Sequence, residues 1–223
     1  PMDYWATPET SAALCRNLKC ESLDDAMRIL HADPLLRLCP AYVGPPLAEG
    51  MDIYGVEHKP VVYSTGVYLE PATHPLATFE SAEEIADTFV WPSPDWFDFS
   101  GVGEVAAKNP HRMILGGAFE PFLTYCQMRG LEQAFADLIC EPEIVRLCLG
   151  KILEFDYECT TRLYEAAGAG NVQASYVSED MGSQTGLMFS PDQVREFLLP
   201  GMKRMIDLAH QAGAYVFHHN DGA

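Results

Sequence analysis

Apolar positions recur every three or four residues in several stretches of the chain, and each such stretch predicts an amphipathic helix. In the clearest one, Ser190 suits the N-cap, Pro191 the first helical position and Gly213 the residue after the end. Other helices are predicted over residues 7–18, 22–31, 81–89, 131–139 and 142–168. Short apolar runs predict strands over residues 2–5, 112–115, 172–177 and 214–217, and an alternating run predicts another over 61–69.

Strands separated by long helices predict parallel pairing with right-handed crossovers. A doubly wound sheet would carry a phosphate-binding glycine loop after its first strand, and the segment 5–8, Trp-Ala-Thr-Pro, is not one. The predicted fold class is therefore α/β, of the (β/α)8 TIM-barrel family, with about the first four βα units present. We expect residues 1–223 to form a single partial barrel domain with an irregular, proline-rich insertion at about 35–110, and residues 116–122 to form a glycine-bearing turn.

Polar side chains follow each predicted strand, and in a barrel the carboxyl ends of the strands share one face. The residues expected to converge there are Thr7 and Glu9, Glu120, Glu179 and Asp180, and His219 and Asp221. We expect Glu120, Glu179 and Asp180 to be the catalytic acids or bases. The alternative is that these carboxylates only cap helices or loops.

His219 and Asp221 are of residue types that bind metal ions, so they are the candidate metal ligands. A simple hydrogen-bonded pair at a strand end is the alternative. His218 alternates with His219 along the strand and is expected to face the opposite side and pack against a helix. The candidate substrate-binding residues are Gln184, Tyr68 and Phe122.

Charge and cysteine content narrow the classes of partner and compartment. The chain has 14 Lys and Arg against 32 Asp and Glu, a formal net charge of −18, which argues against nucleic acid or an anionic membrane surface as a partner. Its apolar runs are far shorter than a membrane span requires. The seven cysteines form no C-x-x-C pair, which predicts reduced thiols and a cytoplasmic protein.

Several short motifs, spread over nearly the whole chain, resemble those of the uroporphyrinogen decarboxylase superfamily. They begin at Gly116 (Gly-Gly-Ala-Phe-Glu-Pro-Phe), Met128 (Met-Arg-Gly-Leu-Glu), Glu141 (Glu-Pro-Glu), Asp180 (Asp-Met-Gly-Ser-Gln), Ser190 (Ser-Pro-Asp), Leu199 (Leu-Pro-Gly-Met-Lys) and His219 (His-Asn-Asp-Gly). Asp52-Ile-Tyr-Gly-Val and residues 68–76 resemble the methyltransferase-related branch. The family's barrel has eight strands, so the resemblance implies that the chain is a fragment of a longer protein. An unusual half-barrel would instead expose two sheet edges that need a partner.

The resemblance also implies a cofactor. The family's methyltransferases carry His-x-Cys-Gly after the fourth strand, where His and Cys bind zinc together with a more distant cysteine. Here His219 matches the histidine and Asp221 stands in the place of the first cysteine. Zinc holds a thiol as its reactive thiolate. We therefore expect zinc at His219 and Asp221, with a corrinoid as substrate or as the cofactor of a partner corrinoid protein.

The decarboxylases of the family grip substrate carboxylates with an arginine-rich run after the first strand. The segment from Trp5 to Glu9, which follows the predicted first strand, has no arginine, and this counts against decarboxylation. The favoured function is a metal-assisted methyltransferase that acts on a small-molecule substrate, using a corrinoid or other methyl donor and a thiol acceptor. The alternatives are a metal-independent uroporphyrinogen decarboxylase and a non-catalytic small-molecule-binding barrel. A homodimer is the expected assembly.

Overall fold

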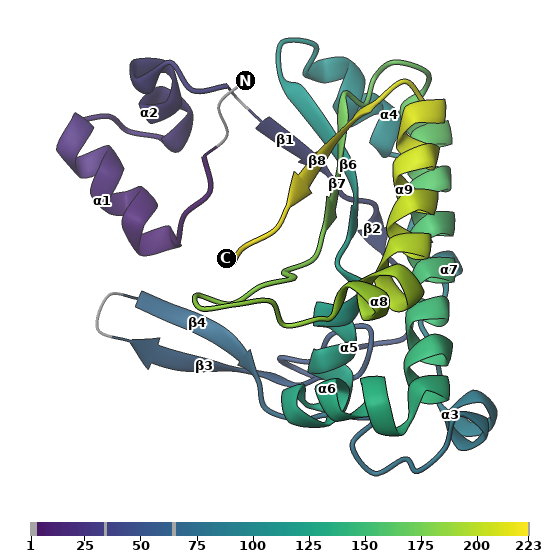
Figure 1. Ribbon diagram of the computed structural model, residues 1–223. Coiled ribbons are helices and arrows are strands. Elements are labelled where there is room, and N and C mark those ends of the chain that lie inside the picture. Colours follow the sequence, from purple (N-terminus) through teal and green to yellow (C-terminus); the bar gives the residue numbers. More distant parts are fainter. Residues whose placement is uncertain (1–3, 34, 64–65, 223) are drawn as a thin grey trace.

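The centre of the protein is a four-stranded parallel sheet. The computed structural model describes residues 4–33, 35–63 and 66–222 (Figure 1). The sheet has the order β1 (Leu35–Leu38), β6 (Met113–Phe119), β7 (Ala174–Ser178) and β8 (Tyr215–His219). All three pairings are parallel, and the strands lie in the sheet in their order along the chain. The protein is thus an α/β fold with a parallel sheet, as the alternation of strands and helices predicts.

Helices cover one face of this sheet, while the first two helices lie on its other side (Figure 1). The helices are α1 (Pro8–Leu18), α2 (Leu23–Leu30), α3 (Ala82–Thr88), α4 (Val102–Lys108), α5 (Pro121–Arg129), α6 (Leu131–Cys140), α7 (Pro142–Ala167), α8 (Pro191–Gln193) and α9 (Leu199–Gln211). Of these, α7 packs on β6, α9 on β7 and β8, and α4 on β1. No helix in the described part of the chain is both long enough and apolar enough to cross a membrane.

The helix starts follow local capping chemistry. The side chains of Thr7, Ser22, Ser81 and Ser190 each accept a hydrogen bond from the backbone N–H three residues later, which satisfies one of the free donors of the first turn. The segment Val194–Leu198, between α8 and α9, is a π-helix. It lies just before Pro200, which has no N–H to donate to a carbonyl four residues earlier and whose ring disturbs an α-helix. A wider turn is a common way to absorb such a disturbance.

The predicted first strand is wrong. Residues 2 and 3 lie outside the described residues, and Tyr4 and Trp5 belong to no strand. The first strand of the sheet is Leu35–Leu38 instead, at the start of the segment predicted as an insertion. Thr7 caps α1 and Glu9 lies in its first turn, so neither follows a strand of the sheet.

Other segments between residues 39 and 122 also differ from the prediction. The run 61–69 forms parts of two antiparallel strands, β3 (His58–Tyr63) and β4 (Gly66–Pro71). The two-residue strands β2 (Ala41–Tyr42) and β5 (Phe97–Asp98) form an antiparallel pair. A short 3-10 helix at Pro94–Trp96 directly precedes β5. The glycine-bearing turn predicted at 116–122 is wrong, because β6 continues to Phe119 and α5 begins at Pro121. A Cβ on Gly116 would lie 2.5 Å from Leu163 Cδ2, so this glycine lets α7 approach the strand.

Strand β8 is exposed on one face. Tyr215 and Phe217 are 78% and 49% exposed, so the predicted buried strand is wrong on that side. Val216, which lies between them, packs against the hydrophobic core, so Tyr215 and Phe217 point to the opposite face of the sheet. His218 is also exposed rather than packed in a core, and its Nδ1 lies 2.8 Å from the carbonyl oxygen of Val177.

Candidate functional site

Three acidic or histidine side chains meet where β7 and β8 end. His219 is the last residue of β8, Asp221 lies two residues beyond it, and Asp180 lies two residues beyond the end of β7. His219 Nε2 is 3.4 Å from Asp180 Oδ1 and 3.7 Å from Asp221 Oδ1, and one ligand atom from each residue lies within 4.8 Å of the others. We refer to these residues as the Asp-His-Asp cluster.

The spacing of the Asp-His-Asp cluster suits a shared metal ion. With metal–ligand bonds of about 2.0–2.2 Å, the ligand atoms of a tetrahedral site lie roughly 3.4 Å apart. An imidazole nitrogen with two carboxylate oxygens is a harder donor set than the thiolate-containing one that the family resemblance implies. One imidazole nitrogen and two carboxylate oxygens at this spacing therefore fit a divalent first-row metal, and zinc is among the candidates. None of these three residues supplies a sulfur ligand.

The two loops of the cluster are fastened to each other by backbone and amide contacts. The side-chain oxygen of Asn220 accepts a hydrogen bond of 2.7 Å from the N–H of Met181, and the N–H of Asp221 donates to Asp180 Oδ1 at 2.9 Å. Gly222 has φ +110°, and a Cβ there would lie 2.3 Å from the carbonyl carbon of Gly182. Each residue of the His219–Gly222 motif thus has a structural reason: two possible ligands, one amide that joins the loops, and one glycine that permits their contact.

The Asp-His-Asp cluster continues onto the exposed face of the sheet. The ring of Tyr176 is stacked near that of His219, with centroids 6.2 Å apart and an interplanar angle of 21°. On its other side the Arg37 guanidinium lies 5.7 Å from the centre of the Tyr176 ring. Arg37 comes from β1, so three strands of the sheet contribute to this row of side chains.

Glu179 is a buried carboxyl next to the Asp-His-Asp cluster. It is 3% exposed and accepts a hydrogen bond of 2.7 Å from the N–H of Phe122, in the first turn of α5. Burial raises the pKa of Glu179 to about 8, and the negative charges of Glu120 and Asp180 act in the same direction. The hydrogen bond from Phe122 lowers the pKa but does not outweigh burial. A carboxyl that titrates near neutral pH is suited to accept and return a proton.

A hollow of about 140 Å³ opens beside these acids. Glu120, Glu179 and Asp180 line it, and its apolar wall is formed by Phe122, Leu123, Cys126, Leu131, Phe135 and Met188. Because Asp180 belongs both to this hollow and to the Asp-His-Asp cluster, a ligand in the hollow would lie next to a metal bound by the cluster. The three predicted catalytic residues are thus brought together with the two predicted metal ligands, although their roles stay predictions.

The predicted substrate-binding residues do not gather in the same way. Phe122 lines the hollow, but its ring is 2% exposed and packs edge-to-face on Phe189 with the ring centroids 4.8 Å apart. Gln184 is exposed in the loop after β7. Tyr68 lies half-exposed in the β3–β4 hairpin against Tyr63, and it lines neither the hollow nor the Asp-His-Asp cluster.

Sequence reasoning missed Arg37 and gave Asp180 a different role. With the first strand predicted at residues 2–5, Arg37 falls outside the predicted site, whereas the structure places it in β1. The segment that follows the true first strand also has no arginine from Cys39 to Tyr42. A four-residue run of Leu-Leu-Arg-Leu that ends shortly before Pro40 was the available signal for the strand.

Comparisons with known proteins agree with the fold and the motifs. Residues 102–223, more than half of the chain, match the family described as uroporphyrinogen decarboxylase (URO-D). A solved structure of a methyltransferase from Methanosarcina mazei is similar over 88% of this chain and 53% of that chain, with a TM-score of 0.52 and 15% sequence identity. This chain therefore spans about half the length of that methyltransferase, and at this identity the likeness shows the fold alone.

No curated protein matches the chain. The family resemblance read from the motifs is confirmed, since most of the motifs lie within the matched residues. By this match over more than half of its length, the chain belongs to the uroporphyrinogen decarboxylase family.

Proposed function

We propose that the chain carries part of the active site of a metal-assisted methyltransferase, with Asp180, His219 and Asp221 as metal ligands. The methyl group comes from a corrinoid or another methyl donor and passes to a thiol. The observation that carries the proposal is the convergence of the three possible ligand atoms within 4.8 Å at the carboxyl ends of two neighbouring strands. That end of the strands is where proteins of the TIM-barrel class place their active sites.

A metal ion held by Asp180, His219 and Asp221 would supply one thing, stabilisation of the acceptor thiol as a thiolate at neutral pH. The residues of the chain position the ligands and handle the proton. Tyr176 supports the ring of His219, and the Asn220 amide holds the two loops together. The buried carboxyl of Glu179 has a pKa of about 8, so it is suited to accept the proton that the thiol releases.

The finer architecture follows from the same proposal. The four parallel strands correspond to the first four βα units of a (β/α)8 barrel, and the uncovered face of the sheet corresponds to the barrel interior. A corrinoid protein is the proposed partner, and a cytoplasmic location is proposed as well. The seven cysteines support it, because all of them are free.

The test combines metal binding with turnover. Zn²⁺ and Mn²⁺ are titrated into the metal-free protein by calorimetry, and the demethylation of methylcobalamin with a small thiol is followed by absorbance. We expect Asp221→Asn and His219→Ala to weaken metal binding at least tenfold and to reduce turnover in proportion. Asp192→Asn, an equal charge change at a 93% exposed side chain, is the control and should change neither. Equal metal affinity in the Asp221→Asn variant and the unchanged protein contradicts the proposal.

Decarboxylation of a carboxylated tetrapyrrole is a second candidate, because of one observation. Arg37 places a guanidinium near the Asp-His-Asp cluster, beyond Tyr176, and guanidinium groups bind carboxylates in a bidentate manner. The negative charges of the nearby Glu120 and Asp180 repel a polyanionic substrate, and for this reason we rank it second. Turnover of uroporphyrinogen that needs Arg37 but no metal would favour it over methyl transfer. If neither activity is found and Glu179→Gln changes no measured rate, a non-catalytic binding protein is the better description.

A further inference from the structure

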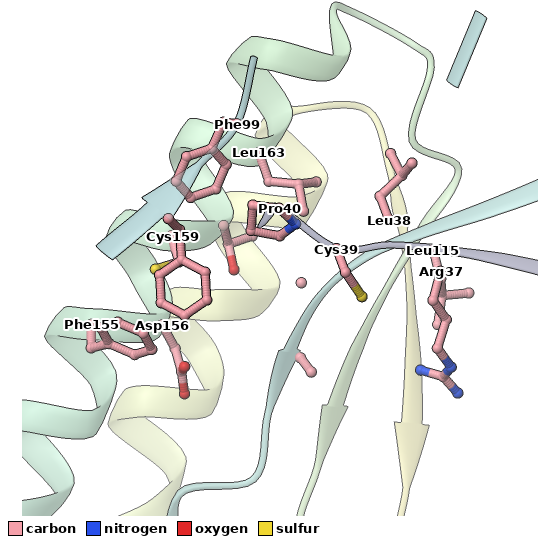
Figure 2. Close-up of a pocket in the computed structure, with 14 residues that line it drawn as sticks. Arg37, Leu38, Cys39, Pro40, Phe99, Leu115, Phe155, Asp156, Cys159 and Leu163 are labelled. Carbon is pink, nitrogen blue, oxygen red and sulfur yellow. The ribbon is translucent and has the colours of Figure 1, made fainter. Parts of the chain in front are cut away.

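A second space with a charged group in its wall lies away from the Asp-His-Asp cluster. A cavity of about 250 Å³ is bounded by α7, by the carboxyl ends of β1 and β6, and by β5 and the residues after it (Figure 2). None of its lining residues lines the hollow beside Glu179 or belongs to the Asp-His-Asp cluster. Cavities of about 150 Å³ accommodate benzene, so this one has room for a somewhat larger molecule.

Three aromatic rings form much of the apolar wall. Phe97 and Phe155 lie with ring centroids 6.0 Å apart, and Phe99 lines the cavity next to them. Leu38, Leu115 and Leu163 add aliphatic surface. A wall of this kind binds alkyl groups, and the faces of its rings also attract a cation.

One carboxyl in this wall has no partner. Asp156 lies on α7 and, among the described residues, makes no hydrogen bond or ion pair. Figure 2 shows its carboxyl group on the α7 side of the cavity, whereas the Arg37 guanidinium points away from α7 and lies instead over Tyr176. A partly buried carboxyl without a partner is costly, because it must either lose its hydration or stay protonated. A cationic ligand in the cavity would offset this cost by pairing with the ionised carboxyl.

We propose that this cavity binds a small organic cation, an alkylated ammonium ion whose charge pairs with Asp156 and whose alkyl groups contact the phenylalanine rings. Pairing of a carboxylate with aromatic faces is the usual way in which proteins bind quaternary ammonium groups. The net charge of −18 on the chain adds a long-range attraction for cations. The inference does not depend on the proposed methyltransferase activity.

The protonation of Asp156 makes the proposal testable through pH. Burial raises the pKa of Asp156 to about 8, so this carboxyl must lose its proton when a permanently charged cation binds near neutral pH. The nearest other titratable groups on the surrounding elements are Arg37, Cys39, Tyr54, Asp98 and Cys159. Glu158 and Arg162 of α7 lie next to Cys159 and form an ion pair with each other. Burial raises the pKa of Cys159 to about 12 and that of Tyr54 well above its usual range, so both stay neutral in the relevant pH interval.

The experiment compares choline with 3,3-dimethylbutan-1-ol, which has the same shape but a carbon in place of the charged nitrogen. Calorimetry at pH 8.5 should show choline binding at least tenfold more tightly than the neutral alcohol. A carboxyl with a pKa of 8 is about three-quarters ionised at pH 8.5 but only about 3% ionised at pH 6.5. The Kd for choline should therefore be about 20-fold higher at pH 6.5 than at pH 8.5. Asp156→Asn should weaken choline binding at least tenfold and remove this pH dependence.

Two controls keep the result interpretable. Glu154→Gln removes the same charge from an exposed position on the same helix and should leave choline binding within twofold. Circular dichroism should show that Asp156→Asn stays folded, since asparagine has nearly the same shape and replaces a carboxyl that has no hydrogen-bond partner among the described residues. The proposal is overturned if choline does not bind at millimolar concentration, if the neutral alcohol binds as tightly as choline, or if Asp156→Asn binds choline as the unchanged protein does.

Discussion

Replacing Glu179 by Gln should stabilise the protein at alkaline pH and leave its stability at acid pH almost unchanged. In the folded chain the pKa of Glu179 rises from an ordinary 4.5 to about 8 because the carboxyl is buried. Below pH 4.5 the carboxyl is protonated in both the folded and the unfolded protein, so it makes no pH-dependent difference. Between pH 4.5 and 8 only the unfolded chain loses the proton, and stability falls as the pH rises.

The size of the effect follows from this difference in pKa. A rise from 4.5 to about 8 at 1.36 kcal/mol per pKa unit gives an upper value of about 5 kcal/mol above pH 8. A glutamine at the same place carries no charge, and its side-chain oxygen can still accept the hydrogen bond from the Phe122 N–H. The Gln variant should therefore be more stable than the unchanged protein by up to about 5 kcal/mol at pH 8.5, and by less than about 0.5 kcal/mol at pH 4.5.

Urea unfolding followed by circular dichroism at pH 4.5, 6, 7 and 8.5 measures this difference. Titrating groups that do not interact with Glu179, Asp156 included, contribute equally to both proteins and cancel in the comparison. Glu154→Gln, at an exposed position, is the matched control and should give a small difference that does not change with pH. Parallel stability curves for the Glu179→Gln variant and the unchanged protein between pH 5 and 8 would refute the reasoning, because they would mean that Glu179 titrates normally.

Three further substitutions test other parts of the structure. Gly222→Ala should weaken metal binding at least tenfold without a large loss of overall stability. A Cβ there would lie 2.3 Å from the carbonyl carbon of Gly182 and would push the two loops apart. Calorimetric titration with Zn²⁺ measures the change in affinity. Arg129→Leu should lower the free energy of unfolding by about 3–5 kcal/mol in urea. It removes the ion-pair partner, 2.7 Å away, of the fully buried Asp137 carboxylate, which then keeps only its hydrogen bonds from Tyr125 and Gln133. A loss below about 1 kcal/mol would contradict this. Ser190→Ala removes the side-chain acceptor of the Gln193 N–H but keeps the reciprocal bond from the backbone N–H of residue 190 to the Gln193 side chain. It should cost about 1 kcal/mol in the same assay, whereas Ser190→Thr should cost less than half of that.

The sequence predicted those elements whose signals are local. A helix start depends on one side chain and the N–H three residues later, so the caps at Thr7, Ser22, Ser81 and Ser190 could be read directly. The first strand could not be placed in this way. Leu35–Leu38 is short, and its partner strand begins more than 70 residues later, so its place in the sheet depends on contacts that no local pattern records.

The glycines of β6 show a second limit of sequence patterns. Gly116 and Gly117 suggested a turn, but a Cβ on Gly116 would meet Leu163 of α7. A glycine that permits close packing and a glycine that permits a turn look the same in one sequence. The candidate site was predictable in part because the strand-end rule needs only the order of strands, whereas the proximity of Asp180 to His219 depends on how two loops meet.

The joining of the loops after β7 and β8 has a thermodynamic consequence. Since the Asn220 amide and the Gly222–Gly182 contact already fix the two carboxylate-bearing segments, little conformational entropy remains to be lost when an ion is captured. Metal binding should therefore cost little conformational entropy in the two loops. Amide hydrogen exchange in residues 180–182 and 219–222 should accordingly be slow before any metal is added. In this protein, the backbone rather than the ion would set the shape of the binding site.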